Sequence, residues 1–147
     1  MSVRFAGYAA LFDRPDRGGD IIRKGAFAAT LSGRASPAGL PLYLNHDPRQ
    51  RIGTVASLAE DARGLRVIAE SDSGPVLIGQ GLSFGYRVRA AARSPCGQYR
   101  ELTQLDLIEV SLVARPMQPL ARVVATDAPS PPLMPPNDTP KETENGL

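Results

Sequence analysis

His46 is the only histidine in a chain of 147 residues, so it has no competitor as an imidazole base. It lies in the segment LNHDP, where an apolar stretch meets a turn that contains Asp47 and Pro48. The pKa of free histidine lies near neutrality, and a histidine at the end of a strand is well placed to act as a general base. The alternative is a solvated loop histidine beside an aspartate, without a chemical role.

Ser83 lies between Gly81 and Gly85 in the segment GLSFGYR. Glycines on both sides allow other groups to approach the backbone closely, which suits a hydroxyl that must reach a substrate carbonyl. The same pattern suits an ordinary strand entry. The nucleophile elbow of the α/β-hydrolases is excluded, because that elbow leads into a helix and here an alternating, strand-like pattern follows the serine.

Glu109 lies in the apolar run LDLIEVSLVARP. A carboxylate that faces a core is costly unless it is paired or functional, and it could orient a histidine as the third member of a triad does. The alternative is a rim carboxylate paired with an arginine. Asp106 is the other candidate, but in a regular strand it faces the opposite side from Glu109.

Composition excludes several other functions. No apolar run approaches the ~20 residues that a helical membrane span needs, which indicates no membrane partner. A single cysteine, Cys96, and a single histidine exclude a disulfide framework and a Cys/His zinc site, and no cofactor is indicated. The sequence pI is about 9.0, but the cations are dispersed and aromatic residues make up only 5%, so direct nucleic-acid binding is not expected. Cys96 is predicted to be an exposed thiol in a turn.

The chain divides at Ala125 into a predicted folded domain, 1–125, and a predicted disordered tail, 126–147. The tail holds six prolines and four acidic residues but only one lysine, and few of its residues are large and apolar. Such a segment cannot bury enough surface to offset its ordering entropy. A domain of the remaining size has a modest core, which oligomerisation often supplements, so a homodimer is an open alternative.

Strand patterns dominate the predicted domain. The expected strands are residues 2–11, 40–45, 51–58, 64–71, 82–91 and 99–113, the last as one long strand or two. Residues 59–63 and 94–98 have the composition of turns. Residues 24–33 are the best helix candidate, and residues 74–81 are a candidate for one further turn of helix. The predicted class is mainly β (α+β), a barrel or sandwich with one or two short helices.

Five segments in one order resemble the prohead maturation proteases of HK97-type tailed phages, which also occur in gene transfer agents. The segments are FAGYAALFDRPDRGGDIIRKGAF, LYLNHDPRQRIG, RGLRVIAE, GLSFGYRV and LIEVSLVARPMQPLARV. Together they cover most of residues 5–123. The family is similar in fold to the herpesvirus assembly proteases, so the resemblance implies a β-barrel of about six to seven strands.

The resemblance implies a serine endopeptidase that cleaves major capsid protein and scaffold segments during prohead maturation. It maps His46 onto the catalytic histidine and Ser83 onto the nucleophile, and Glu109 is chosen as the third member. Oxyanion donors are expected from backbone N–H groups near Ser83–Gly85 or from the turn at Ala114 and Arg115. The implied location is the assembling prohead in the cytoplasm of the bacterial host.

Two other functions remain open at this point. The chain could be a catalytically silent relative that serves as a capsid-binding scaffold module of the same fold. It could also be an unrelated β-sandwich binding protein. The presence of both Ser83 and His46 favours the enzyme, because a silent relative has no need of them.

Overall fold

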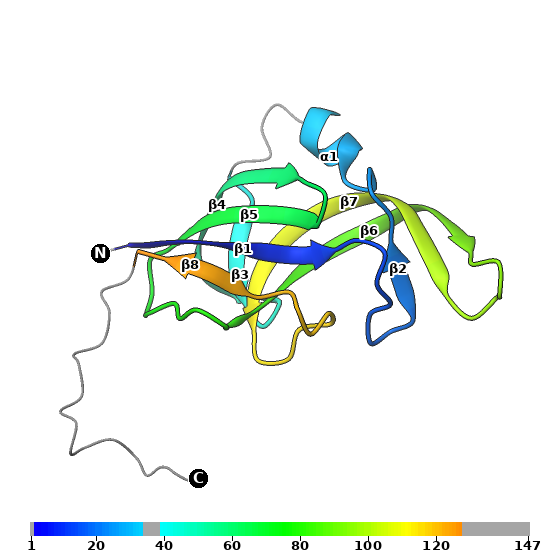
Figure 1. The fold of residues 1–147 in the computed structure, drawn as a ribbon. Helices are drawn as coiled ribbons and strands as arrows, with labels where there is room; N and C mark the ends of the chain where they lie inside the picture. Colours follow the sequence, from blue (N-terminus) through cyan, green and yellow to red (C-terminus); the bar gives the residue numbers. More distant parts are fainter. Residues whose placement is uncertain (1, 34–38, 128–147) are drawn as a thin grey trace, which may run out of the picture.

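The computed structural model describes residues 2–33 and 39–127, and these residues form eight strands and one short helix (Figure 1). In chain order the elements are β1 (Val3–Leu11), β2 (Asp20–Ile22), α1 (Ala28–Gly33), β3 (Pro41–Leu44), β4 (Asp47–Glu60), β5 (Gly64–Ser71), β6 (Gly81–Arg93), β7 (Arg100–Val113) and β8 (Val123–Thr126). The prediction of a mainly β domain is confirmed. No helix of the described residues is long and apolar enough to cross a membrane.

Several details of the prediction are corrected. The described strands number eight rather than six or seven, because β2 and β8 were not expected. Residues 74–81 form no helix: Gly74 and Gly79 have positive φ angles of 82° and 94°, which break a helical path. The side-chain oxygen of Gln80 accepts a hydrogen bond from the backbone N–H of Leu77. In a helix this N–H would donate to a backbone carbonyl instead.

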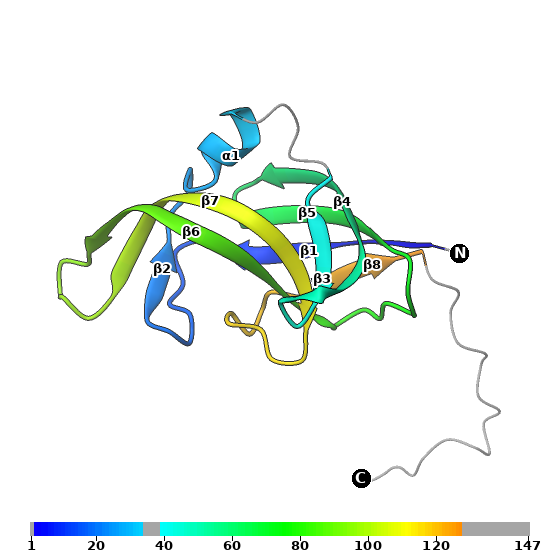
Figure 2. The ribbon, with the colours of Figure 1, turned by 180° about the vertical axis from the view of Figure 1, so that it is seen from behind.

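All the described strands belong to one curled sheet, in the order β2-β7-β3-β4-β5-β1-β8, with β6 on the other edge of β7. The predicted barrel is therefore not a closed one. The chain around the start of β6 meets the chain around the start of β8 through the hydrogen bonds Leu82 N–Ala121 O and Val123 N–Gln80 O, but the described strands form no continuous ladder there. Figures 1 and 2 show how the sheet curls to bring these ends together.

The core lies inside the curl and follows from the alternation of the strands. In β5, Leu65, Val67 and Ala69 are buried, whereas Arg66 between them is exposed. Phe27, just before α1, packs edge-on against Phe84 of β6 with ring centroids 5.3 Å apart. This contact seats the helix over the sheet near the strand that carries Ser83.

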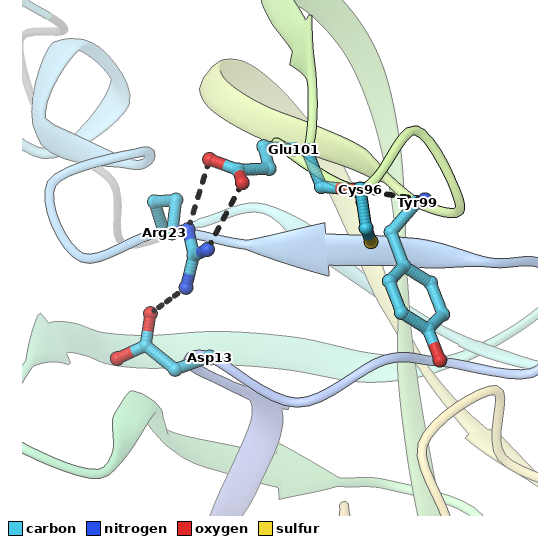
Figure 3. Close-up of polar contacts among 6 residues, drawn as sticks. Asp13, Arg23, Cys96, Tyr99 and Glu101 are labelled. Atoms are coloured by element: carbon cyan, nitrogen blue, oxygen red, sulfur yellow. Dashed lines mark hydrogen bonds and ion pairs between the residues drawn. The ribbon is translucent and has the colours of Figure 1, made fainter.

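The β6–β7 hairpin extends beyond the body of the sheet, and ion pairs tie the part near its turn to the segments around β2 (Figures 1 and 3). Arg23, directly after β2, pairs with Asp13 at 2.8 Å and with Glu101 of β7 at 3.1 Å. The turn predicted at 94–98 joins the two strands, and Cys96 is exposed in it, as predicted. The contacts of Arg23 tie the short strand β2 to the long strand β7.

The last strand continues past the boundary that the sequence predicted at Ala125. Thr126 pairs with Phe5 of β1, and Asp127 exchanges two hydrogen bonds with the backbone of Arg4, at 2.7 and 2.9 Å. Residues 128–147 of the predicted tail lie outside the described residues.

We expect a chain that ends at Asp127 to fold with full stability, whereas one that ends at Ala125 loses about 1–2 kcal/mol. The loss reflects the hydrogen bonds to Arg4, since each contributes about 0.5–1.5 kcal/mol. Urea unfolding of the two truncated chains and the full chain measures the difference. Equal stability of the two truncations would show that the contacts to β1 contribute nothing.

Candidate active site

His46 is held in a strained two-residue turn between β3 and β4. Leu44 pairs with Asp47, and the two residues between them, Asn45 and His46, have positive φ angles of 52° and 62°. Positive φ at both central positions is the pattern of a type I′ hairpin turn, which favours Asn followed by Gly. A histidine in the position of the glycine stores strain, which is typical of functional sites.

Asn45 anchors this turn to the end of β7. Its backbone N–H donates to Leu112 O at 2.9 Å, and its side-chain Oδ1 accepts the N–H of Ala114 at 3.3 Å. The anchoring follows from the topology, since β3 runs parallel to β7 with Leu44 beside Leu112. The turn is thereby placed next to the segment of β7 that contains Glu109.

Glu109 is buried, with 5% of its surface exposed, and it contacts His46 directly. Its Oε1 lies 2.6 Å from His46 Nδ1. A carboxylate can only accept at this distance, so Nδ1 carries the proton and Nε2 is left as the basic nitrogen. The hydrogen bond raises the pKa of His46 above its ordinary value of 6.5, and partial burial of the ring opposes that rise.

Gly85 makes room for the Glu109 carboxylate. The two residues pair across β6 and β7 and therefore share a face of the sheet. A Cβ atom at position 85 would lie 2.5 Å from Glu109 Oε1, well inside van der Waals contact. A side chain at this second glycine of the GLSFG segment would therefore force the Glu109 carboxylate out of its present position.

Ser83 lies on the same face, on the other edge of β7 from His46. It is buried, with 8% exposure, and pairs in register with Ser111 of β7. Ser83 and His46 line one cavity of about 270 Å³, whose walls are mainly apolar. The other lining residues are Ala9, Asp16, Ile22, Leu82, Phe84, Tyr86, Arg115, Met117 and Gln118. Three neighbouring elements, β6, β7 and the turn after β3, thus supply the three predicted residues (Figure 2).

Asp106, the alternative third residue, lies outside this cluster. It pairs with Arg89 of β6 in an ion pair on the exposed side of the hairpin. The strand alternation expected from the sequence does not hold here, because Ile108 is an extra, unpaired residue of β7: Gly85 pairs with Glu109, but Tyr86 pairs with Leu107. What separates Asp106 from the site is its ion pair with Arg89.

Two polar residues of the cluster were not singled out as functional from the sequence. Asn45 could have been noticed as a residue that tolerates positive φ beside the histidine. Ser111 shares the strand parity of Glu109, which places both on the face of Ser83. That parity was visible in the sequence, but the contacts of Ser111 depend on the pairing of β3 and β6 with β7.

The family is decided by comparison with known proteins. A family model described as caudovirus prohead serine protease matches residues 1–76 and 78–130. The chain belongs to this family. The resemblance noted in the sequence is thereby confirmed. Among individual prohead proteases, that of Enterobacteria phage HK97 is 39% identical over 64 residues, which are 43% of this chain and 28% of the phage protein.

Solved structures of herpesvirus proteases are similar to the prohead protease fold seen here. The protease of KSHV matches with a TM-score of 0.51 and 14% identity, over 77% of this chain and 60% of that chain. The varicella-zoster virus protease matches with a TM-score of 0.41 and 21% identity, over 48% of this chain and 32% of that chain. At these identities the likeness concerns the fold alone.

Proposed function

We propose that this prohead protease is a serine endopeptidase that cleaves capsid protein and scaffold segments during prohead maturation. Ser83 is the nucleophile, His46 the general base and Glu109 the residue that orients His46. The observation that carries the proposal is the 2.6 Å contact between Glu109 Oε1 and His46 Nδ1, beside the cavity that Ser83 also lines.

The chemistry follows from the protonation of His46. Nδ1–H stays bound to Glu109, so Nε2 takes the proton of the Ser83 hydroxyl as Oγ attacks the scissile carbonyl. The tetrahedral intermediate needs hydrogen-bond donors, for which backbone N–H groups near Ser83–Gly85 and a group from the turn at Arg115 are the candidates. Nε2 then donates the proton to the leaving amine, and water hydrolyses the acyl-enzyme by the same route.

The proposed place of action is inside the assembling prohead, in the cytoplasm of the bacterial host. The proposed substrates are the major capsid protein and its scaffold segment, and a homodimer is a further proposal. No cofactor, nucleic acid or membrane takes part in the proposed reaction.

Co-expression with the neighbouring major capsid protein tests the proposal. We expect the wild-type chain to shorten the capsid protein, as seen by mass spectrometry, and Ser83→Ala to leave it at full length. Cys96→Ser is the matched control and should cleave normally, because Cys96 lies in the exposed turn between β6 and β7. If particles form only when the chain is present, yet no capsid protein is ever shortened, the chain is a scaffold module instead.

The pH dependence of cleavage should report the contact between His46 and Glu109. General-base catalysis needs neutral His46, so kcat/KM is expected to rise with pH and to level off above the pKa of His46. Because the hydrogen bond to Glu109 raises that pKa, the midpoint should lie above 6.5 in the wild type and lower in Glu109→Gln. If the midpoint does not move in Glu109→Gln, the hydrogen bond between His46 and Glu109 does not influence the group whose titration controls cleavage.

A further inference from the structure

Ser111 is fully buried on β7, directly opposite Ser83 of β6. Its hydroxyl donates to Glu109 Oε2, with an oxygen–oxygen distance of 2.6 Å. The hydroxyl oxygen of Ser111, Oγ, in turn accepts a hydrogen bond from the backbone N–H of His46 at 3.1 Å. One hydroxyl thus connects the carboxylate and the histidine of the candidate site.

We propose that Ser111 is a positioning residue that holds both the carboxylate of Glu109 and the backbone of His46 in their reactive arrangement. The inference rests on the proposed function, since it assigns a role in that same site. Within residues 2–33 and 39–127, the hydrogen bonds of the Ser111 hydroxyl go to these two neighbours, and its proposed action is through them.

The first part of the argument concerns the carboxylate. A carboxylate has two oxygens, and each needs a donor when the group is buried. Ser111 binds Oε2 and so leaves Oε1 directed at His46 Nδ1. Without this donor, the carboxylate of Glu109 is free to rotate toward other hydrogen-bond donors. The orientation that directs Oε1 at His46 Nδ1 would then be one of several.

The second part concerns the turn. His46 has a positive φ of 62°, a conformation that a non-glycine residue adopts only when its surroundings hold it. The hydrogen bond from its N–H to Ser111 is one such restraint, and the contacts of Asn45 with β7 are the others. Because Ser111 and Glu109 are two residues apart on a strand, both point to the turn from one rigid element.

Kinetics of Ser111→Ala on a capsid-derived peptide test the role. We expect kcat to fall about 10- to 100-fold, the usual effect of losing a hydrogen-bonding partner just behind the reacting groups, while KM changes less than about twofold. Ser71→Ala is the matched control, since Ser71 is equally buried on β5 and, in the part of the chain that the structure describes, its hydroxyl hydrogen-bonds locally to Ser73. Ser111→Thr keeps the hydroxyl and should retain most of kcat.

Nuclear magnetic resonance of the ring nitrogens of His46 gives a readout that does not depend on activity. The chain has one histidine, so ring signals from ¹⁵N-histidine need no assignment. We expect the protonated Nδ1 signal to be sharp in the wild type and exchange-broadened in Ser111→Ala, with a lower titration midpoint. Two other charged residues, Asp16 and Arg115, line the cavity together with His46. They are the same in the wild type and in Ser111→Ala, as are the neighbouring Asp47 and Glu109.

The two measurements separate failure of this inference from failure of the proposed function. If the wild type cleaves peptide and Ser111→Ala does so with unchanged kcat and unchanged ring signals, the positioning role is overturned. If the wild type cleaves nothing, yet the His46 signals depend on Ser111, the proposed function fails and the positioning of the pair by Ser111 stands. A loss of kcat equal to that of Ser71→Ala would also overturn the inference.

Discussion

Ser83→Ala should lower kcat/KM for a capsid-derived peptide by about 10⁴- to 10⁶-fold, the effect typical of removing the nucleophile of a serine protease. The fold should survive, because alanine fits the space of a buried serine and the backbone pairing of Ser83 with Ser111 does not involve the hydroxyl. Steady-state or single-turnover cleavage measures the rate, and thermal unfolding checks the fold.

The control for this variant is again Ser71→Ala, a buried serine on β5, a strand that supplies none of the described residues lining the cavity. It should cleave at the wild-type rate. A serine-directed phosphonate should label the wild type at Ser83 and leave Ser83→Ala unmodified. Cleavage by Ser83→Ala within tenfold of the wild-type rate would overturn the assignment of the nucleophile.

Glu109→Gln should lower kcat/KM by about 10²- to 10⁴-fold, less than Ser83→Ala does. The amide is uncharged and presents donors as well as an acceptor, so it cannot accept from both His46 Nδ1 and the hydroxyl of Ser111 as the carboxylate does. The imidazolium that forms during the reaction also loses its countercharge. The same peptide assay measures the effect.

Asp106→Asn is the matched variant on β7, at a carboxylate outside the contact with His46. It removes a carboxylate of the same strand but breaks only the exposed ion pair with Arg89, so we expect cleavage within about twofold of the wild type. If Asp106→Asn proves the more damaging of the two changes, the assignment of the third residue is reversed.

The correct parts of the predicted fold are those in which local pattern and tertiary pairing agree. Residues 64–71 were predicted as a strand and form β5 with the same bounds, because their alternation and flanking turns are complete within the segment. Strands β2 and β8 were missed, since three or four residues show no period. Both exist only because a longer strand, β7 or β1, provides their hydrogen-bond partner.

The components of the site could be read from the sequence, and their assembly could not. Residue type singled out His46, Ser83 and Glu109. The two-residue period used to set Asp106 aside is broken in β7 at Ile108, and it is the ion pair with Arg89 that occupies Asp106. Whether His46 meets Glu109 depends on β3 pairing parallel to β7, across 63 residues of chain. A local pattern cannot specify such a pairing, because its free energy comes from the burial of distant segments against one another.

The strained turn and the role proposed for Ser111 were decided by tertiary structure for the same reason. A non-glycine residue seldom adopts positive φ on local preference, and the pairing of β3 with β4 together with the bonds from β7 to the turn holds His46 there. By itself the sequence determined which side chains could do chemistry, whereas the extra residue of β7 at Ile108 changed the face that simple alternation predicted. The curled sheet decided which of them touch, because contact across strands is set by the register of pairing and by the space that a residue such as Gly85 leaves open.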